Sequence, residues 1–306
     1  MTTSIDIVGL GEPMIEFNQV KPSEPLYLQG FGGDTSNATI AAARQGARCA
    51  YITKLGDDEF GRLFLDLWRK ENVYTDGVRT DPTAHTAVYF VRHGANGHVF
   101  SYLRAGSAAS RIVPGDLDRA LIGRARFLHV SGISQAISPS ACETVFAAID
   151  AARAAKVKVC YDTNLRLRLW SLDRAREVIR ATAALSDYFL PSLEDARSFT
   201  GLEKPDDIVD WCLEAGASTV LLKLGADGVI VATARGRKHV PGFKVNCVDA
   251  TGAGDCFAGA LLARLCAGDD VMVAARYANA AAALSTTGYG AVAPIPRPSE
   301  VCALAT

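Results

Sequence analysis

The segment Gly252-Ala253-Gly254-Asp255 places three small residues and a carboxylate before an apolar helical pattern, Cys256 to Leu265. Small side chains leave backbone N–H groups uncovered, and such groups at a helix N-terminus attract anions such as phosphate. The segment lacks the lysine of a P-loop and carries Asp255 instead. We therefore expect Asp255 to take the proton of a hydroxyl that attacks a phosphoryl group, while the amides stabilise the charge. The alternative is a packing turn with Asp255 as a helix cap.

A second polar segment, Gly32-Gly33-Asp34-Thr35-Ser36-Asn37, lies near the start of the chain. Its glycines allow the backbone to approach a ligand closely. Asp34 and Asn37 offer hydrogen-bond acceptors and donors to hydroxyl groups. Taken alone, the segment is also compatible with a turn and a helix cap.

Two arginines indicate an acidic substrate. In FSYLRAGSAAS, Tyr102 and Arg104 alternate along a strand-like run, so their side chains point the same way, and Tyr89 lies on the preceding run. Arg166 follows a predicted strand in YDTNLRLRLW. Arginines that enter a pocket are suited to neutralising and gripping a carboxylate. The alternatives are surface charge or, for Arg166, a contact to nucleotide phosphates.

The elements that position these residues alternate between short β-branched runs and alanine-rich helical stretches, which predicts a doubly wound, mostly parallel α/β sheet. The predicted strands are Ile5 to Val8, Cys49 to Thr53, Phe127 to Val130, Val157 to Tyr161, Tyr188 to Leu190 and Thr219 to Leu222. The predicted helices are Asn37 to Gln45, Glu59 to Glu71, Pro139 to Ala155, Leu172 to Ala184 and Asp206 to Ala215.

Two segments without helical patterns interrupt this alternation. They lie at about 13–32 and 86–106, and the second contains a predicted turn at 94–97. We expect them to form one small β lid over the carboxyl ends of the strands, where open α/β sheets bind ligands. The whole chain, 1–306, is then a single domain with this lid inserted. Exposed β edges and aromatic residues in the lid predict a homodimer or a larger homo-oligomer.

Composition excludes several classes of protein. The formal net charge is −1 over 306 residues, so there is no electrostatic reason to expect a nucleic-acid or membrane partner. Eight scattered cysteines and a start without a secretory pattern predict a cytoplasmic protein with reduced thiols. The five histidines form no set with metal-ligand spacing.

The string Asp249-Ala250-Thr251-Gly252-Ala253-Gly254-Asp255 resembles the signature D-T-x-G-A-G-D of the ribokinase-like carbohydrate kinases, also called the PfkB family. The segment Gly32 to Ala38 resembles the family's second signature, which holds sugar hydroxyls. Both lie in the family's order, and the resemblance covers essentially the whole chain. It implies the ribokinase-like fold with a β lid, ATP as phosphoryl donor and Mg²⁺ as cofactor.

Within this family, YDTNLRLRLW resembles the segment D-x-N-x-R-x-x-L-W of the 2-dehydro-3-deoxygluconate kinases, and GEPMIEF also resembles that subgroup. The resemblance implies transfer of phosphate to O6 of 2-dehydro-3-deoxy-D-gluconate. The alternatives are a kinase for a neutral ketose such as fructose, a ribose kinase, or a sugar-acid sensor without catalysis. The preference at C4 does not follow from sequence.

The resemblance assigns residues to both ligands. The catalytic set is Asp255 with Gly252, Ala253 and Gly254, and the substrate set is Gly33, Asp34, Asn37, Tyr89, Tyr102, Arg104, Arg166 and Asp255. The nucleotide set is Asn164, Arg166, Ser192, Lys223, Gly225, Ala226, Gly228, Gly252, Gly254 and Asn279.

One motif departs from the family pattern. Where many members have N-x-x-E near magnesium, this chain has Ser192-Leu193-Glu194-Asp195. Magnesium is still expected because it neutralises phosphate charge, but its protein contacts stay unassigned, with Glu194 as a candidate substitute. Asp249 and Thr251 resemble residues that form a monovalent-cation site in some relatives.

Overall fold

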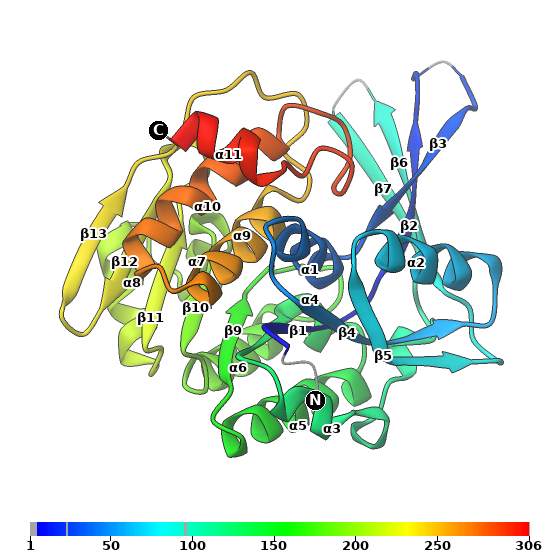
Figure 1. Ribbon diagram of the computed structural model, residues 1–306, viewed down its shortest axis with the longest axis horizontal. Coiled ribbons are helices and arrows are strands. Elements are labelled where there is room, and N and C mark those ends of the chain that lie inside the picture. Colours follow the sequence, from blue (N-terminus) through cyan, green and yellow to red (C-terminus); the bar gives the residue numbers. More distant parts are fainter. Residues whose placement is uncertain (1–4, 23, 95–96, 306) are drawn as a thin grey trace.

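The computed structural model describes residues 5–22, 24–94 and 97–305; the turn predicted at 94–97 includes residues 95 and 96, which lie outside this range. Its main sheet has nine strands in the order β13-β12-β11-β10-β9-β8-β1-β4-β5 (Figure 1). These strands are β1 (Ile7–Leu10), β4 (Cys49–Gly56), β5 (Val73–Asp81), β8 (Phe127–Ser131), β9 (Lys158–Asp162), β10 (Tyr188–Leu190), β11 (Thr219–Lys223), β12 (Val229–Thr233) and β13 (Gly236–Val240). The strands from β11 to β5 pair in parallel, whereas β12 and β13 are antiparallel.

Helices cover both faces of this sheet (Figure 1). On one face lie α1 (Asp34–Arg44), α2 (Glu59–Lys70), α9 (Ala253–Ala267), α10 (Val271–Ser285) and α11 (Pro298–Ala305). On the other lie α3 (Arg119–Gly123), α4 (Gly132–Ala136), α5 (Pro139–Ala154), α6 (Leu172–Ala183), α7 (Leu193–Thr200) and α8 (Pro205–Glu214). Adjacent strand residues alternate between the two cores, as Ile7 and Val8 do. The predicted doubly wound fold is confirmed.

The predicted strands and the helices of the alternating core all form, with shifted ends. Strand β5 was missed because its sequence, VYTDGVRTD, is polar and lies at the sheet edge, where one side of the strand is solvated. Helix α7 was missed because it has only eight residues. No helix in the described part of the chain is long and apolar enough to span a membrane.

The lid is a separate four-stranded sheet in the order β3-β2-β6-β7, which projects from the main body (Figure 1). Its strands are β2 (Met14–Gln19), β3 (Tyr27–Gly32), β6 (Ala87–Gly94) and β7 (Gly97–Leu103). The two excursions meet through the parallel pair β2–β6, in which Glu16 lies opposite Tyr89. One face, with Phe17, Phe31 and Phe90, packs against the main core; the opposite face carries Tyr89 and Tyr102.

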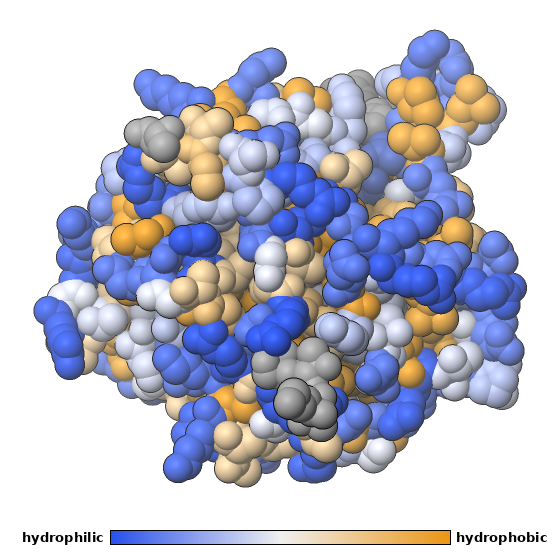
Figure 2. All heavy atoms as spheres, viewed as in Figure 1, coloured by the Kyte–Doolittle hydropathy of each residue, from blue (hydrophilic) through white to orange (hydrophobic). Residues whose placement is uncertain are grey.

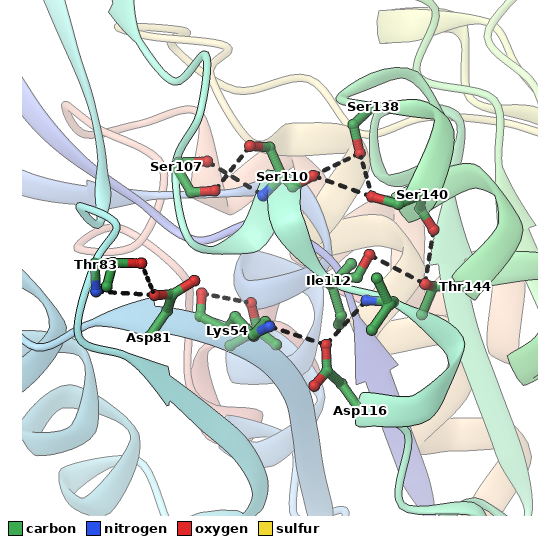
Figure 3. Close-up of polar contacts among 12 residues, drawn as sticks. Lys54, Asp81, Thr83, Ser107, Ser110, Ile112, Asp116, Ser138, Ser140 and Thr144 are labelled. Atoms are coloured by element: carbon green, nitrogen blue, oxygen red, sulfur yellow. Dashed lines mark hydrogen bonds and ion pairs between the residues drawn. The ribbon is translucent and has the colours of Figure 1, made fainter.

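A series of hydroxyl groups anchors the chain where it leaves the lid (Figure 3). Ser110 donates from its Oγ to the carbonyl of Ser107 at 2.7 Å, and Ser138 donates to the carbonyl of Ser110 at 2.6 Å. Thr144 on α5 donates to the carbonyl of Ile112. The segment 107–112, which includes the short 3-10 turn Ala109–Arg111, is therefore fixed to helix α5 and its N-terminal cap.

Candidate active site

Helix α9 begins at Ala253, three residues before the apolar pattern that predicted it. Its cap, Gly252, has φ +77°, and a Cβ there would lie 3.0 Å from the Ala291 side chain, so this position requires glycine. The Ala253 N–H donates to the carbonyl of Ala250 at 3.2 Å. The amides of Gly254 and Asp255 belong to the first turn, where N–H groups have no partner within the helix. They are the better candidates for an anion site.

Asp255 faces helix α1 at the carboxyl edge of the sheet. Asn37 Nδ2 donates to Asp255 Oδ2 at 2.8 Å, although the two residues lie far apart in sequence. Burial, and then the carboxylate of Asp34, raises the pKa of Asp255 well above its usual range, while the Asn37 bond and the charge of Lys223 act in the opposite direction. A carboxylate with a raised pKa is a stronger base once ionised, as general-base catalysis requires.

The start of α1 presents two buried oxygens without a hydrogen-bond partner among the described residues: Asp34 Oδ1 and Asn37 Oδ1. The cap residue Gly33 has φ +109°, and a Cβ there would lie 2.5 Å from the Glu12 carbonyl. Buried acceptors normally have donors, so two that lack them fit a ligand that brings O–H groups. Asp34 and Asn37 therefore form one polar cluster in the first turn of α1.

Lys223 and Asp162 form an ion pair beside this group. Lys223, the last residue of β11, donates from its Nζ to Asp162 Oδ2 at 2.7 Å, and Asp162 ends β9. The side chains are 14% and 5% exposed. Because parallel strands end at one edge of the sheet, the pair lies close to Asp255, and both charges influence the pKa of Asp255 after the larger effects of burial and Asp34.

The loop after β9 differs from expectation. Asn164, assigned to the nucleotide, donates from its Nδ2 to Asp34 Oδ2 at 3.3 Å and so lies beside the substrate candidates. Arg166 is exposed and donates to the carbonyl of Leu165. Asp195 accepts from Thr163 Oγ1 and the Leu165 N–H, so its carboxylate braces this loop.

On the lid side, the predicted arginine is already paired. Arg104 donates to Glu12, whose side chain is completely buried and also accepts from Ser107 Oγ at 2.7 Å. Arg104 Nε is buried and has no hydrogen-bond partner within the described residues, and its guanidinium lies 5.6 Å from the Tyr102 ring centre. Burial raises the pKa of Glu12, and the Arg104 charge opposes that rise. Arg104 is thus half of a largely buried ion pair beside the lid.

Tyr89 also has a carboxylate partner, since its hydroxyl donates to Glu16 on the neighbouring strand β2. Glu12 and Glu16 were not predicted as site residues, although both belong to the segment GEPMIEF. The sequence does carry a signal for Glu12 as a site residue, because Glu12 follows the carboxyl end of the buried strand β1. For Glu16 the signal appears only when the lid strands are paired.

A cavity of about 650 Å³ lies between the end of β11 and helices α9 and α10, within the volume range of small-molecule sites. Its lining includes six predicted nucleotide residues: Lys223, Gly225, Ala226, Gly228, Gly254 and Asn279. Asn279 donates from its Nδ2 to the carbonyls of Val240 and Pro241, both at 3.0 Å, so it shapes the wall. The lining does not include Asn164, Arg166, Ser192 or Gly252. Ser192 instead caps α7 by accepting from the Asp195 N–H.

The geometry places the Asp255 carboxylate, two acceptors without partners among the described residues and a cavity of about 650 Å³ at one edge of a parallel sheet. This arrangement is suited to small-molecule phosphoryl transfer. Comparison with known proteins agrees. A family model for pfkB family carbohydrate kinases matches residues 4–298. The chain therefore belongs to the pfkB family of carbohydrate kinases, as its motifs indicated. Because such a kinase phosphorylates an alcohol group, the protein is a phosphotransferase with an alcohol acceptor.

Individual relatives differ in substrate. The chain is 36% identical over 307 residues to the 2-dehydro-3-deoxygluconokinase of Thermoproteus tenax, covering 97% of this chain and 93% of the relative. It is 34% identical over 316 residues to fructokinase-2 of Solanum habrochaites, covering 97% and 95%. A Vibrio cholerae O395 fructokinase, solved with fructose, ADP and calcium, superposes with a TM-score of 0.89 at 27% identity, covering 99% of this chain and all of that one.

Proposed function

We propose that this protein transfers the γ-phosphoryl group of ATP to O6 of 2-dehydro-3-deoxy-D-gluconate. The observation that carries the proposal is the position of Asp255, whose carboxylate contacts Asn37 on the hydroxyl-binding helix α1 while its own helix lines the nucleotide cavity. A hydroxyl held by Asp34 and Asn37 would lie beside the base and in front of the Gly254 and Asp255 amides. The similarity to a 2-dehydro-3-deoxygluconokinase supports the choice of substrate.

Recognition of the sugar acid would rest on Arg104. Its Nε is buried without a partner among the described residues and so is free to donate to a substrate carboxylate. Tyr89 and Tyr102, whose ring centres are 5.9 Å apart, would form the wall beside it. Arg166 is exposed and would have to turn from the Leu165 carbonyl to reach the same carboxylate.

A kinase for a neutral ketose is the second candidate, and a specific observation favours it. Glu12 already neutralises Arg104, and the carboxylates of Asp34, Asp162 and Asp255 lie nearby. A carboxylate substrate would meet net negative charge there, whereas sugar hydroxyls can donate to these oxygens. The similarity to fructokinase-2 is nearly as high as that to the sugar-acid kinase.

A substrate panel separates the candidates. ADP release is measured with 2-dehydro-3-deoxygluconate, fructose and ribose, in the wild type, in Arg104→Ala and in the exposed control Arg168→Ala. We expect the acid to be preferred and Arg104→Ala to lower kcat/KM for the acid about tenfold or more, as loss of a charged hydrogen bond does. Preference for fructose with no effect of Arg104→Ala would support the ketose kinase. Binding of the acid without ADP release would identify a sensor.

Magnesium fits this site as an ion bound mainly through the nucleotide. The structure contains no group of three or more potential metal ligands within its described ranges. Asp162 is paired with Lys223, and Asp195 braces the loop after β9. Mg²⁺ commonly keeps several waters and takes one or two carboxylates plus phosphates, so exposed Glu194 is the remaining protein candidate. Bound there, the ion would neutralise phosphate charge.

The monovalent-cation dependence stays a prediction. Asp249 Oδ1 accepts from the Thr251 N–H and Oγ1, and its Oδ2 accepts from the Gly290 N–H. The carboxylate thus joins the loop before α9 to the loop near 290. Its hydrogen bonds support a bracing role for Asp249.

We also propose that the protein forms a homodimer through its lid and works in the cytoplasm, where ATP is present. Apolar residues gather at the projecting end of the lid (Figure 2), among them Leu26 and Leu28, which are 57% and 68% exposed. Leu28 continues a row across the sheet through Asn18 and Val91 to Phe100, on the face that carries Tyr102. All eight cysteines are free thiols, as expected in a reducing compartment.

A further inference from the structure

The side chain of Lys223 lies between the nucleotide cavity and the N-terminus of α9. It lines the cavity and is 14% exposed. Its Nζ is 3.3 Å from the position that a Cβ on Gly254 would occupy. Since Gly254 has no side chain, the ammonium group lies directly beside the first-turn amides. A phosphoryl group bound to those amides would therefore contact Lys223.

Asp162 fixes this ammonium group in place. The two side chains lie 2.7 Å apart at the carboxyl ends of β9 and β11, the strands on either side of β10. Asp162 also accepts from the Asn164 N–H through its other oxygen, so the carboxylate itself is held. A lysine has three N–H donors, and Asp162 takes one of them. The remaining donors can bind phosphate oxygens without breaking the ion pair.

The negative charge around Asp255 would repel ATP unless a cation such as Lys223 offsets it. Asp34 and Asp162 are buried beside the half-buried Asp255, and ATP would bring further negative charge to them. The amides of α9 supply only partial positive charge, equivalent to about half an elementary charge. The four residues directly before α9, 249–252, include no lysine, and Lys244 farther along that loop is exposed. The family's magnesium motif is altered at Ser192. Lys223 supplies a full positive charge from a different strand.

We propose that Lys223 binds the phosphoryl group during its transfer and that Asp162 positions the Lys223 side chain. This proposal rests on the proposed ATP-dependent activity. The substrate hydroxyl oxygen forms a bond to the γ-phosphorus, and its proton passes to Asp255. The bond between that phosphorus and the β,γ-bridging oxygen breaks, and ADP leaves with the electron pair. Lys223 donates hydrogen bonds to the γ-phosphoryl oxygens throughout the transfer.

The competing explanation is that Lys223 only neutralises the buried carboxylate of Asp162. Four variants separate the two roles: Lys223→Met, Lys223→Arg, Asp162→Asn and the double variant Lys223→Met/Asp162→Asn. Each single charge removal leaves the other buried charge without its partner, which destabilises the fold. The double variant removes both charges and avoids this problem. Lys238→Met, at an exposed position on β13, is the matched control.

Calorimetric titration with ATP and with ADP is the decisive measurement, because the two nucleotides differ only in the γ-phosphoryl group. We expect Lys223→Met and the double variant to weaken ATP binding about tenfold or more while ADP affinity changes far less, as loss of a charge-assisted bond predicts. Asp162→Asn lowers the ratio of ATP affinity to ADP affinity in the same direction. Lys223→Arg keeps part of the preference for ATP that Lys223→Met loses. Lys238→Met leaves the ratio unchanged.

Turnover gives the second readout. We expect kcat to fall about a hundredfold or more in Lys223→Met and in the double variant, the range seen when a donor to developing charge is removed. Equal loss of ATP and ADP affinity, or recovery of wild-type kcat in the double variant, would overturn the proposal. If no sugar in the panel is phosphorylated, the proposed substrate fails instead, and the ratio of nucleotide affinities still tests Lys223.

Discussion

The carboxylates near Asp255 and its hydrogen-bond donor shift the pKa of Asp255 in opposite directions. Burial, then the like charge of Asp34, raises the pKa of Asp255, whereas the N–H of Asn37 lowers it. As a general base, Asp255 works only when ionised, so activity is lost as the pH falls through its pKa. Two substitutions on one helix, Asp34→Asn and Asn37→Ala, should therefore move the pH profile in opposite directions.

Asp34→Asn removes the like charge and lowers the pKa of Asp255, so the acidic limb of kcat/KM moves to lower pH. Asn37→Ala removes the donor to Asp255 Oδ2 and moves that limb to higher pH. Both variants also lower the plateau of kcat/KM about tenfold or more, because each loses a hydrogen bond of a charged group. The check is kcat/KM against pH; shifts of the same sign in both variants would show that Asp255 is not the titrating base.

At the scale of elements, the site depends on the close packing of α1 and α9. Gly259 makes this possible, since a Cβ there would lie 2.2 Å from the Ala38 carbonyl and 2.7 Å from the Ala41 Cβ. Asn37 and Asp255 lie one turn away on the same two helices. The distance between the helices therefore sets the distance between Asn37 and Asp255, which we propose as the hydroxyl-binding residue and the base.

Gly259→Ala should push the two helices apart and lower both stability and turnover. We expect a loss of about 1–3 kcal/mol in the free energy of unfolding, the usual cost of overpacking. Denaturant unfolding with steady-state kinetics checks this. Gly115→Ala is the control, because no atom lies within 4 Å of its added Cβ. Unchanged stability in Gly259→Ala would mean that α1 and α9 can separate without cost.

How much of the fold and of the candidate site the sequence predicts depends on whether the feature lies in one short segment or joins segments far apart in the chain. Asp255 and Asn37 lie in short segments with distinctive spacing, so each could be proposed as a site residue from its own segment. Their 2.8 Å contact could not, because it depends on two helices far apart in sequence. The pairing of Arg104 with Glu12 is equally non-local, so an arginine predicted to bind a substrate carboxylate proved to be paired with a carboxylate of the chain. Helical patterns predicted α5 and α6 well, while the polar edge strand β5 carried no comparable signal.

At the scale of the whole molecule, the lid exposes apolar side chains such as Leu28 to solvent. It contacts the main body through one face and carries Tyr89 and Tyr102 on the other. Leu28 is 68% exposed on that second face. Pairing with a second lid would cover the apolar surface and close the pocket from outside.

Leu28→Asp should therefore convert a dimer into a monomer, because a charge would be buried without a partner. Analytical ultracentrifugation over a range of protein concentrations measures the change. Val273→Asp, at an exposed site on α10 that is 54% accessible, is the control. A wild type that sediments as a monomer at all concentrations would refute the lid dimer.

The most direct test of the central claim is the rate of ADP release by Asp255→Asn with 2-dehydro-3-deoxygluconate, measured beside the binding of that acid and of ATP. The amide keeps the size of the side chain and can still accept from Asn37, but it cannot take a proton. We predict that kcat falls about a hundredfold or more while both dissociation constants stay within a few-fold of the wild type. Turnover close to that of the wild type would contradict the assignment of Asp255 as the base.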